Sequence, residues 1–140
     1  MRIEFHYDIS GFRIRESRRI KRTIARIIND AGRRGGSVAI IFTTDGKLVE
    51  INKEFLKHDY LTDIITFDYC KGKTVNGEIY ISVDRIKENA VLLNTTLKSE
   101  TRRVIFHGFL HLCGYSDAEE KERIIMRDRE DMYLALTEVE

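Results

Sequence analysis

The order of apolar and polar residues predicts a strand and then a helix in the first third of the chain. Residues 1–7, MRIEFHY, alternate apolar and polar side chains with the period of two that is typical of a strand. Residues 17–31 carry apolar side chains at the spacing i, i+4, i+7, i+8 and i+11, which is one face of a helix: Ile20, Ile24, Ile27, Ile28 and Ala31. We expect the glycines that follow to end this helix: Gly32, Gly35 and Gly36.

The rest of the chain predicts three further strands and four further helices. Residues 37–44, SVAIIFTT, are typical of a buried strand, and a turn at residues 44–46 leads into a helix over residues 47–56. Strands over residues 63–70 and 77–83 are expected to form a hairpin through residues 71–76, and helices follow at 84–93, 97–113 and 118–136. This order predicts a single domain over residues 1–140, of the α/β (α+β) class, with a mixed sheet of about four strands surrounded by helices.

Length and composition narrow the class of protein. The chain has 140 residues, of which 42% are hydrophobic, and this is enough for one buried core. No apolar run approaches the roughly 20 residues of a membrane span, and the N-terminus carries charges where a signal peptide would be apolar. We therefore expect a soluble, cytoplasmic protein without membrane contact. Cys70 and Cys113 form no CxxC pair, and each is expected to be a reduced, buried thiol.

The distribution of charge is more informative than the net charge of +1. Between residues 12 and 34, nine basic residues stand against two acidic ones, a local charge of +7. From residue 117 to the end, nine acidic residues stand against four basic ones, a local charge of −5. An asymmetry of this kind suggests that one face of the protein contacts an anionic partner.

Two of the four histidines, His107 and His111, lie four residues apart in a predicted helix, so their imidazoles point from the same face. Gly114 suits the left-handed conformation that ends a helix, and the chain can then turn back to offer Asp117 as a third ligand. Two nitrogens and a carboxylate are donors that Zn²⁺ accepts, and they leave a position open for water, as catalytic sites do. We predict a site for zinc, or another divalent transition metal, at His107, His111 and Asp117. The alternative is that the histidines are ordinary residues at the edge of the core.

The spacing His-x3-His-x2-Gly-x2-ligand is also that of the zinc helix of metzincin peptidases, HExxHxxGxxH. In those enzymes the glutamate at the second position deprotonates the attacking water. Gly108 occupies that position here and has no side chain. A metallopeptidase would thus keep its ligands and lose its base, which makes this the weakest of the functional alternatives.

The segment HGFLHLCGYSD, residues 107–117, resembles the signature HGxLHLxGYDH of the YbeY family of bacterial rRNA maturation factors and agrees at seven of its nine fixed positions. Residues 51–67, INKEFLKHDYLTDIITF, are similar to the family pattern LNxxYRxxDxPTDVLSF, with matches at Asn52, Asp59, Thr62, Asp63 and Phe67. The strand GEIYIS, residues 77–82, resembles the next family strand. The resemblance implies a zinc-dependent endoribonuclease, specific for single-stranded RNA, which acts in 16S rRNA 3′-end maturation and ribosome biogenesis, with rRNA and the ribosomal subunit as partners.

The chain departs from the family pattern at two chemically important positions. The third zinc ligand of the family, a histidine, falls on Asp117, and a carboxylate ligand leaves the metal less able to acidify its water. A family arginine thought to lie by the active site falls on Leu56, so its action on phosphate is lost or passes to Lys57 or His58. This loss is the best support for a second alternative, a non-catalytic ribosome-assembly factor with a structural metal.

The basic segment and nearby aromatic residues are candidates for RNA binding. Four arginines recur at i, i+4, i+7 and i+11 opposite the isoleucines, and we expect them to contact phosphates: Arg15, Arg19, Arg22 and Arg26. A merely solvated helix face has the same pattern. Tyr60, Tyr69 and Tyr115 are candidates for stacking on bases, whereas Phe67 is more simply a core residue. No catalytic base is identifiable; Asp63 is the candidate, although a role of Thr62-Asp63 in starting a strand accounts for it equally well.

Overall fold

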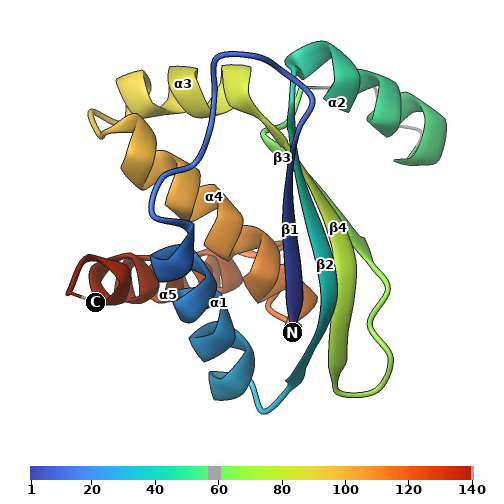
Figure 1. The fold of residues 1–140 in the computed structure, drawn as a ribbon, viewed down its shortest axis with the longest axis vertical. Helices are drawn as coiled ribbons and strands as arrows, with labels where there is room; N and C mark the ends of the chain where they lie inside the picture. Colours follow the sequence, from blue (N-terminus) through green and yellow to red (C-terminus); the bar gives the residue numbers. More distant parts are fainter. Residues whose placement is uncertain (57–60, 140) are drawn as a thin grey trace.

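The computed structural model describes residues 1–56 and 61–139, and Figure 1 shows their arrangement. Four strands form the sheet: β1 (Arg2–Tyr7), β2 (Arg34–Thr43), β3 (Ile64–Asp68) and β4 (Thr74–Ser82). The helices are α1 (Ser17–Asp30), α2 (Asp45–Ile51), α3 (Val83–Leu92), α4 (Leu97–Leu112) and α5 (Glu120–Val139). A π-helical segment, η1 (Asn52–Leu56), extends α2. The α/β class and the mixed four-stranded sheet are thereby confirmed.

The strand order is β1-β2-β4-β3. β1 and β4 both run parallel to β2, with Ile40 of β2 opposite Ile79 of β4. β3 pairs antiparallel with β4, which confirms the predicted hairpin. The chain therefore leaves β2, passes through α2 to the edge of the sheet, and returns by the hairpin into the position beside β2. This route places β3 at an edge of the sheet, where β4 is its one partner among the described strands.

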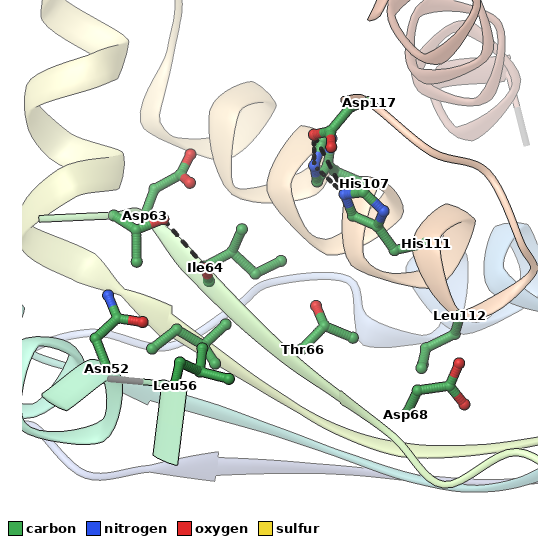
Figure 2. Close-up of a pocket in the computed structure, with 12 residues that line it drawn as sticks. Asn52, Leu56, Asp63, Ile64, Thr66, Asp68, His107, His111, Leu112 and Asp117 are labelled. Atoms are coloured by element: carbon green, nitrogen blue, oxygen red, sulfur yellow. Dashed lines mark hydrogen bonds and ion pairs between the residues drawn. The ribbon is translucent and has the colours of Figure 1, made fainter. Parts of the chain in front are cut away.

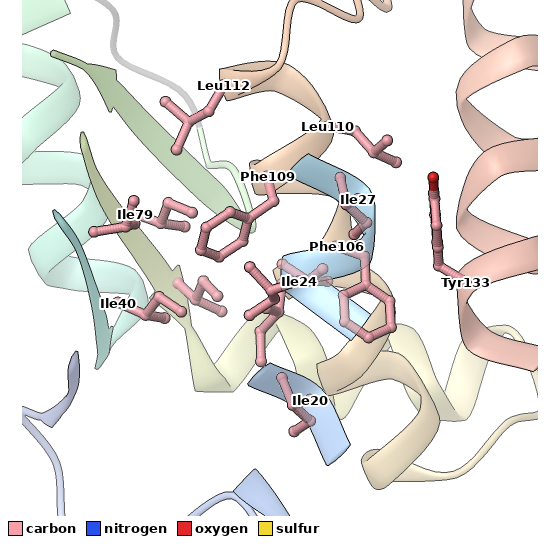
Figure 3. Packing of buried hydrophobic residues seen from close by; sticks show 14 of the residues in the cluster. Ile20, Ile24, Ile27, Ile40, Ile79, Phe106, Phe109, Leu110, Leu112 and Tyr133 are labelled. Carbon is pink, nitrogen blue, oxygen red and sulfur yellow. The ribbon is translucent and has the colours of Figure 1, made fainter. Parts of the chain in front are cut away.

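Helices α1, α4 and α5 lie on one face of the sheet (Figure 1). Figure 3 shows the core between α1, α4 and the strands, where Ile24, Ile40, Ile79, Phe106 and Phe109 are completely buried. Full burial of one such side chain contributes roughly 1.5–3 kcal/mol. The stripe predicted for residues 17–31 supplies the α1 side of this core, and α4 is held against the sheet by its phenylalanines.

Only the first of the three glycines ends α1. Gly32 has φ +71°, whereas Gly35 and Gly36 lie inside β2, next to an irregularity in its pairing with β4. A Cβ on Gly36 would lie 2.7 Å from the carbonyl oxygen of Val75. Gly35 and Gly36 have no room for a side chain, because Met1 lies close to Gly35 and Val75 and Asn76 lie close to Gly36. The helix therefore ends before the three glycines, as expected, but Gly35 and Gly36 are part of the next strand.

The turn expected at residues 44–46 is instead the start of a helix. The Thr44 side chain accepts a hydrogen bond from the backbone N–H of Lys47 at 3.2 Å and caps α2, which begins at Asp45. Threonine followed by aspartate is common both in turns and at helix N-termini. Here the hydrogen bond to the Thr44 side chain identifies a helix N-terminus. The helix expected over residues 47–56 is correspondingly divided into α2 and η1, and α5 begins and ends slightly later than expected.

Two other expectations concern cysteines and membranes. Cys70 and Cys113 are both free thiols, and Cys113 is buried while Cys70 is partly so. Burial raises the pKa of the Cys113 thiol to about 11, so at neutral pH it is an uncharged core residue. Among the helices of the described residues, none combines the length and apolarity needed to cross a membrane.

Candidate metal centre

The last turns of α4 carry both histidines of the predicted site. Thr96 caps this helix by accepting a hydrogen bond from the N–H of Ser99, and Gly114, with φ +100°, allows the chain to leave it. The N–H of Tyr115 then donates to the carbonyl of Leu110 at 3.0 Å, which fixes the reversal. The chain turns back and brings the Asp117 carboxylate to the imidazoles (Figure 2).

The three predicted ligands converge on one point. The Nε2 atoms of His107 and His111 each lie 3.3 Å from Oδ2 of Asp117, and 2.9 Å from one another. Ligand atoms bonded to a tetrahedral zinc at about 2.0–2.2 Å are about 3.3–3.6 Å apart. The two distances to Asp117 thus match the spacing around zinc, while the two imidazole nitrogens lie about 0.4 Å closer together than that spacing.

The hydrogen bonds on the far side of each imidazole determine which nitrogen is free. Nδ1 of His111 lies 2.9 Å from the carbonyl oxygen of Tyr115, and Nδ1 of His107 lies 2.6 Å from Oε2 of Glu130. Both partners only accept, so in the neutral imidazoles the proton is on Nδ1 and the lone pair is on Nε2. Two lone pairs and a carboxylate then face each other without a proton between them. A bound metal cation, or a proton on one of the imidazoles, satisfies this arrangement.

Glu130 of α5 was missed by sequence reasoning. The residue is only 4% exposed, and Oε1 of its side chain accepts a hydrogen bond from Arg103 at 2.8 Å. Burial lowers the pKa of His107, but the hydrogen bond and charge of Glu130, with Asp117 and Asp63, outweigh it and raise that pKa above the ordinary value. The sequence does contain a sign of its role, because Glu130 falls at helical spacing among the other buried residues of α5, which are Met126, Tyr133 and Thr137. A charged side chain on a buried helix face is almost always paired with another charged or polar group.

Gly108 faces the sheet and not the metal ligands. A Cβ at this position would lie 2.9 Å from Cδ1 of Ile79 and 3.0 Å from Cδ1 of Ile64. A glutamate here would have to displace core side chains of two strands. The position that carries the base in metzincins is thus taken up by the packing of α4 on the sheet.

The ligands open onto a cavity of about 520 Å³ between α4, β3 and η1. Its walls include Thr62. Figure 2 shows four further residues of the wall: Asn52, Leu56, Asp63 and Thr66. Leu56, which stands where the related family has arginine, therefore does line the cavity. Its proposed substitutes, Lys57 and His58, lie outside the described residues, as do Asp59 and Tyr60.

Asp63 lies immediately before β3, and its backbone carbonyl accepts a hydrogen bond from the N–H of Ser82 at 3.0 Å. Its carboxyl group lines the cavity but is not one of the three converging ligands. Burial raises the pKa of this carboxyl, the charge of His107 opposes the rise, and Glu130 and Asp117 add to it. Asp63 thus stands directly before β3 and presents a carboxyl group at the cavity wall, and its role as a base stays a prediction.

The other aromatic residues predicted to contact RNA, as far as they belong to the described residues, do not line this cavity. Phe67 packs on Tyr80 and Phe55, the Tyr69 hydroxyl donates to Glu78 at 3.0 Å, and Tyr115 lines a separate cavity beside α5. The core role of Phe67 is consistent with its partial burial against these rings.

The four arginines are divided among different surroundings. Arg15 precedes α1, because that helix begins at Ser17, so the expected helical stripe does not include it. Arg19 donates to the carbonyls of Thr137 and Glu138 at the end of α5. Arg26 pairs with Asp30 at 3.0 Å, and Arg22 is exposed. None of these four arginines is among the described residues that line the metal cavity.

Comparison with known proteins identifies relatives over almost the whole chain. The family model described as Endoribonuclease YbeY matches residues 8–138. An Endoribonuclease YbeY of Flavobacterium psychrophilum is 40% identical over 137 residues, covering 98% of this chain and 97% of its own. Another, of Bacteroides thetaiotaomicron, is 41% identical over 132 residues, covering 93% and 96%.

A solved structure supports the fold. The solution structure of TM1509 from Thermotoga maritima superposes with a TM-score of 0.66 at 28% identity, and the match covers 96% of this chain and 88% of that one. With a family model across residues 8–138 and relatives near 40% identity, the chain belongs to the YbeY endoribonuclease family.

Proposed function

We propose that this protein is a zinc-dependent endoribonuclease, specific for single-stranded RNA, which acts on rRNA during ribosome biogenesis and matures the 3′ end of 16S rRNA. Endoribonuclease is the activity named for the family and for its relatives. The convergence of the lone pairs of His107 and His111 with Asp117, at the wall of a cavity, is the observation that carries the metal dependence. Zinc suits two imidazoles and one carboxylate.

The chain's own residues prepare the site in three ways. Glu130 and the Tyr115 carbonyl hold the imidazoles so that both Nε2 atoms point to the proposed metal position, and Asp117 provides the third ligand there. A divalent metal held by these residues would supply Lewis-acid chemistry for the cleavage of a phosphodiester by water. Asp63, whose pKa is raised by burial, is the proposed group to accept or hold a proton at the cavity wall. The exposed arginines Arg22 and Arg26 are proposed to contact RNA beyond the metal cavity.

Neither alternative function is favoured. An assembly factor with a structural metal would bury and fully coordinate the ion, whereas these ligands face a cavity. A peptidase would need a base at Gly108, and that position packs against Ile79 and Ile64.

The experiment is a cleavage assay with the zinc-loaded protein. One RNA is presented single-stranded and as a duplex with its complement, and each is incubated with protein, with chelator, and with chelator followed by zinc. We expect cleavage of the single strand only, loss with chelator, and recovery with zinc. His111→Ala, purified identically, controls for contaminating nucleases. Cleavage that survives both the chelator and this substitution would refute the assignment, and turnover of casein would favour the peptidase.

The proposed role in rRNA maturation needs a substrate of its own. A transcript that extends beyond the mature 3′ end of 16S rRNA is presented free and within the small ribosomal subunit. We expect cut sites at the mature end in the subunit, and random cutting in both samples would contradict this part of the proposal.

A further inference from the structure

A second cavity, of about 700 Å³, lies between the loop that precedes α1 and the first turns of α4. Four basic residues line it: Arg13, Arg15, Lys98 and Arg102. No acidic residue is among the described residues of its wall, whereas the metal cavity is lined by three aspartates. The two cavities have no lining residue in common.

Arg102 is the unusual member of this set because its side chain is buried, with only 1% of the residue exposed. Its two ion pairs are long, 3.5 Å to Glu16 and 3.3 Å to Glu138, and its Nε–H has no hydrogen-bond partner. A buried guanidinium has five N–H donors, and leaving one unpaired is costly. The wall of the cavity thus contains a buried cation with unused hydrogen-bonding capacity.

Two helix N-termini add to the positive potential. Leu97 and Lys98, the first residues of α4, line the cavity, and α1 begins two residues after Arg15. The N-terminus of α1 has no side-chain cap and no acidic residue in its first turn. Helix N-termini attract anions through their free N–H groups and the helix dipole.

Besides Glu138, which pairs with Arg102, Glu16 is the carboxylate available to offset these charges. It lies 2.7 Å from Lys98 and 3.2 Å from Arg19, in addition to its contact with Arg102. Two carboxylates do not neutralise the four basic residues of the wall, so a ligand with one or two negative charges would be favoured there. Tetrahedral oxyanions match both the donors of arginine and the N–H groups of a helix end.

We propose that this cavity binds a phosphate group, through Arg15, Lys98 and the buried Arg102. The phosphate belongs either to an RNA strand that also reaches the metal centre, a source that rests on the proposed nuclease function, or to free inorganic phosphate. Arg15 acts in this cavity and not on an arginine stripe of α1.

The first test uses inorganic phosphate and the zinc-loaded protein, followed by amide NMR. The wild type is compared with Arg15→Gln/Lys98→Gln, which leaves Arg102 and the core untouched, and with the charge-matched control Arg2→Gln/Lys73→Gln. We expect shifts at residues 9–15 and 97–102, separate from any at residues 107–117, and a Kd at least about tenfold higher in the first variant only. Shifts confined to residues 107–117, or equal affinity in all three proteins, would overturn the proposal.

The second test uses a single-stranded RNA and the same proteins. A loss of RNA affinity in Arg15→Gln/Lys98→Gln, absent from the control, identifies the strand as the source of the phosphate. Unchanged RNA affinity with weakened phosphate binding identifies free phosphate and keeps the site. An equal loss of RNA affinity in both variants would mean that RNA responds only to the overall charge of the protein, and it would refute the RNA strand as the source of the bound phosphate. If phosphate binds as expected but no RNA is ever cleaved, the nuclease function fails and the phosphate site stands.

Discussion

At the residue scale, the two histidines are equivalent in their ligand atoms but not in what holds them. His111 is held by a backbone carbonyl, and His107 by a buried carboxylate on another helix. The ligand triad could be predicted because helix period and a glycine stop are local properties of the sequence. Glu130 could not be assigned in the same way, since its contact joins residues 23 apart across two helices.

Substitution of a ligand should remove the metal. Two imidazoles on one helix turn bind weakly without a third donor, so His111→Ala and Asp117→Ala should each lose most of the zinc, while Asp117→His should retain it. Elemental analysis of dialysed protein measures this, and His6→Ala, on the exposed face of β1, is the control. If Asp117→Ala retained zinc with unchanged affinity, the third ligand would lie elsewhere.

Glu130→Gln should weaken metal binding while the ligands remain. The amide can still approach Nδ1 of His107, but it no longer provides the negative charge that strengthens the imidazole as a ligand. Loss of such a partner typically lowers metal affinity about 10- to 100-fold, which competition with a chromophoric chelator would show. Asp131→Asn is the matched control because it changes the other carboxylate that pairs with Arg103. Equal affinities for the two variants would contradict a positioning role for Glu130.

At the scale of elements, α4 combines two tasks on different faces. His107 and His111 face the cavity, and Gly108 faces Ile64 and Ile79 of the sheet. The sequence predicted most elements because each has its own apolar period. It did not predict strand order, because nothing local specifies that β4 inserts between β2 and β3.

Gly108→Ala should destabilise the fold. Its new methyl group would lie about 3 Å from two isoleucine side chains, and overpacking of this kind costs roughly 1–3 kcal/mol. Urea unfolding of the metal-free protein gives the value without the contribution of zinc. Gly46→Ala in α2 is the matched control, since its nearest contact is 3.9 Å away, and we expect it to stabilise by about 0.5–1 kcal/mol. Equal stability of the two variants would mean that α4 can move away from the sheet.

At the scale of the whole molecule, charges from distant segments meet around α4. Its first turns line the cationic cavity, and its last turns carry the two histidines that meet the Asp117 carboxylate. The sequence indicated the asymmetry of charge, but not that Arg15 and Arg22 face different surroundings. That separation depends on where α1 begins, which the unusual φ of +57° at Glu16 determines.

Glu100 should make stability depend on pH. Burial raises its pKa above the ordinary value, Arg103 opposes this, and its Oε1 has no hydrogen-bond partner. Because the folded-state pKa is raised, the folded protein binds a proton more tightly than the unfolded chain does. This contribution is fully present below the unfolded pKa, near 4.5, and is lost as pH rises through the folded-state pKa. Glu100→Gln should thus be more stable than the parent at pH 7, with a gain that shrinks as the pH approaches 4.5. Parallel urea curves of the two metal-free proteins test this, and a gain independent of pH would exclude the carboxyl group as its cause.

The exposed face of α1 remains a proposed contact for RNA strands that extend beyond the metal cavity. Arg22 and Arg26 lie on this face, and each phosphate contact to a single strand contributes about 0.7 to the slope of log affinity against log salt concentration. Arg22→Gln/Arg26→Gln should therefore weaken the binding of long single-stranded RNA equally for all sequences and reduce that slope by about 1.4. The charge-matched control is Lys47→Gln/Lys87→Gln, at exposed positions of α2 and α3. Trinucleotides should bind equally to all three proteins, because they are too short to reach from the metal centre around α4. If the slope for long RNA stays unchanged in the α1 variant, or falls equally in the control, these arginines form only a solvated helix face.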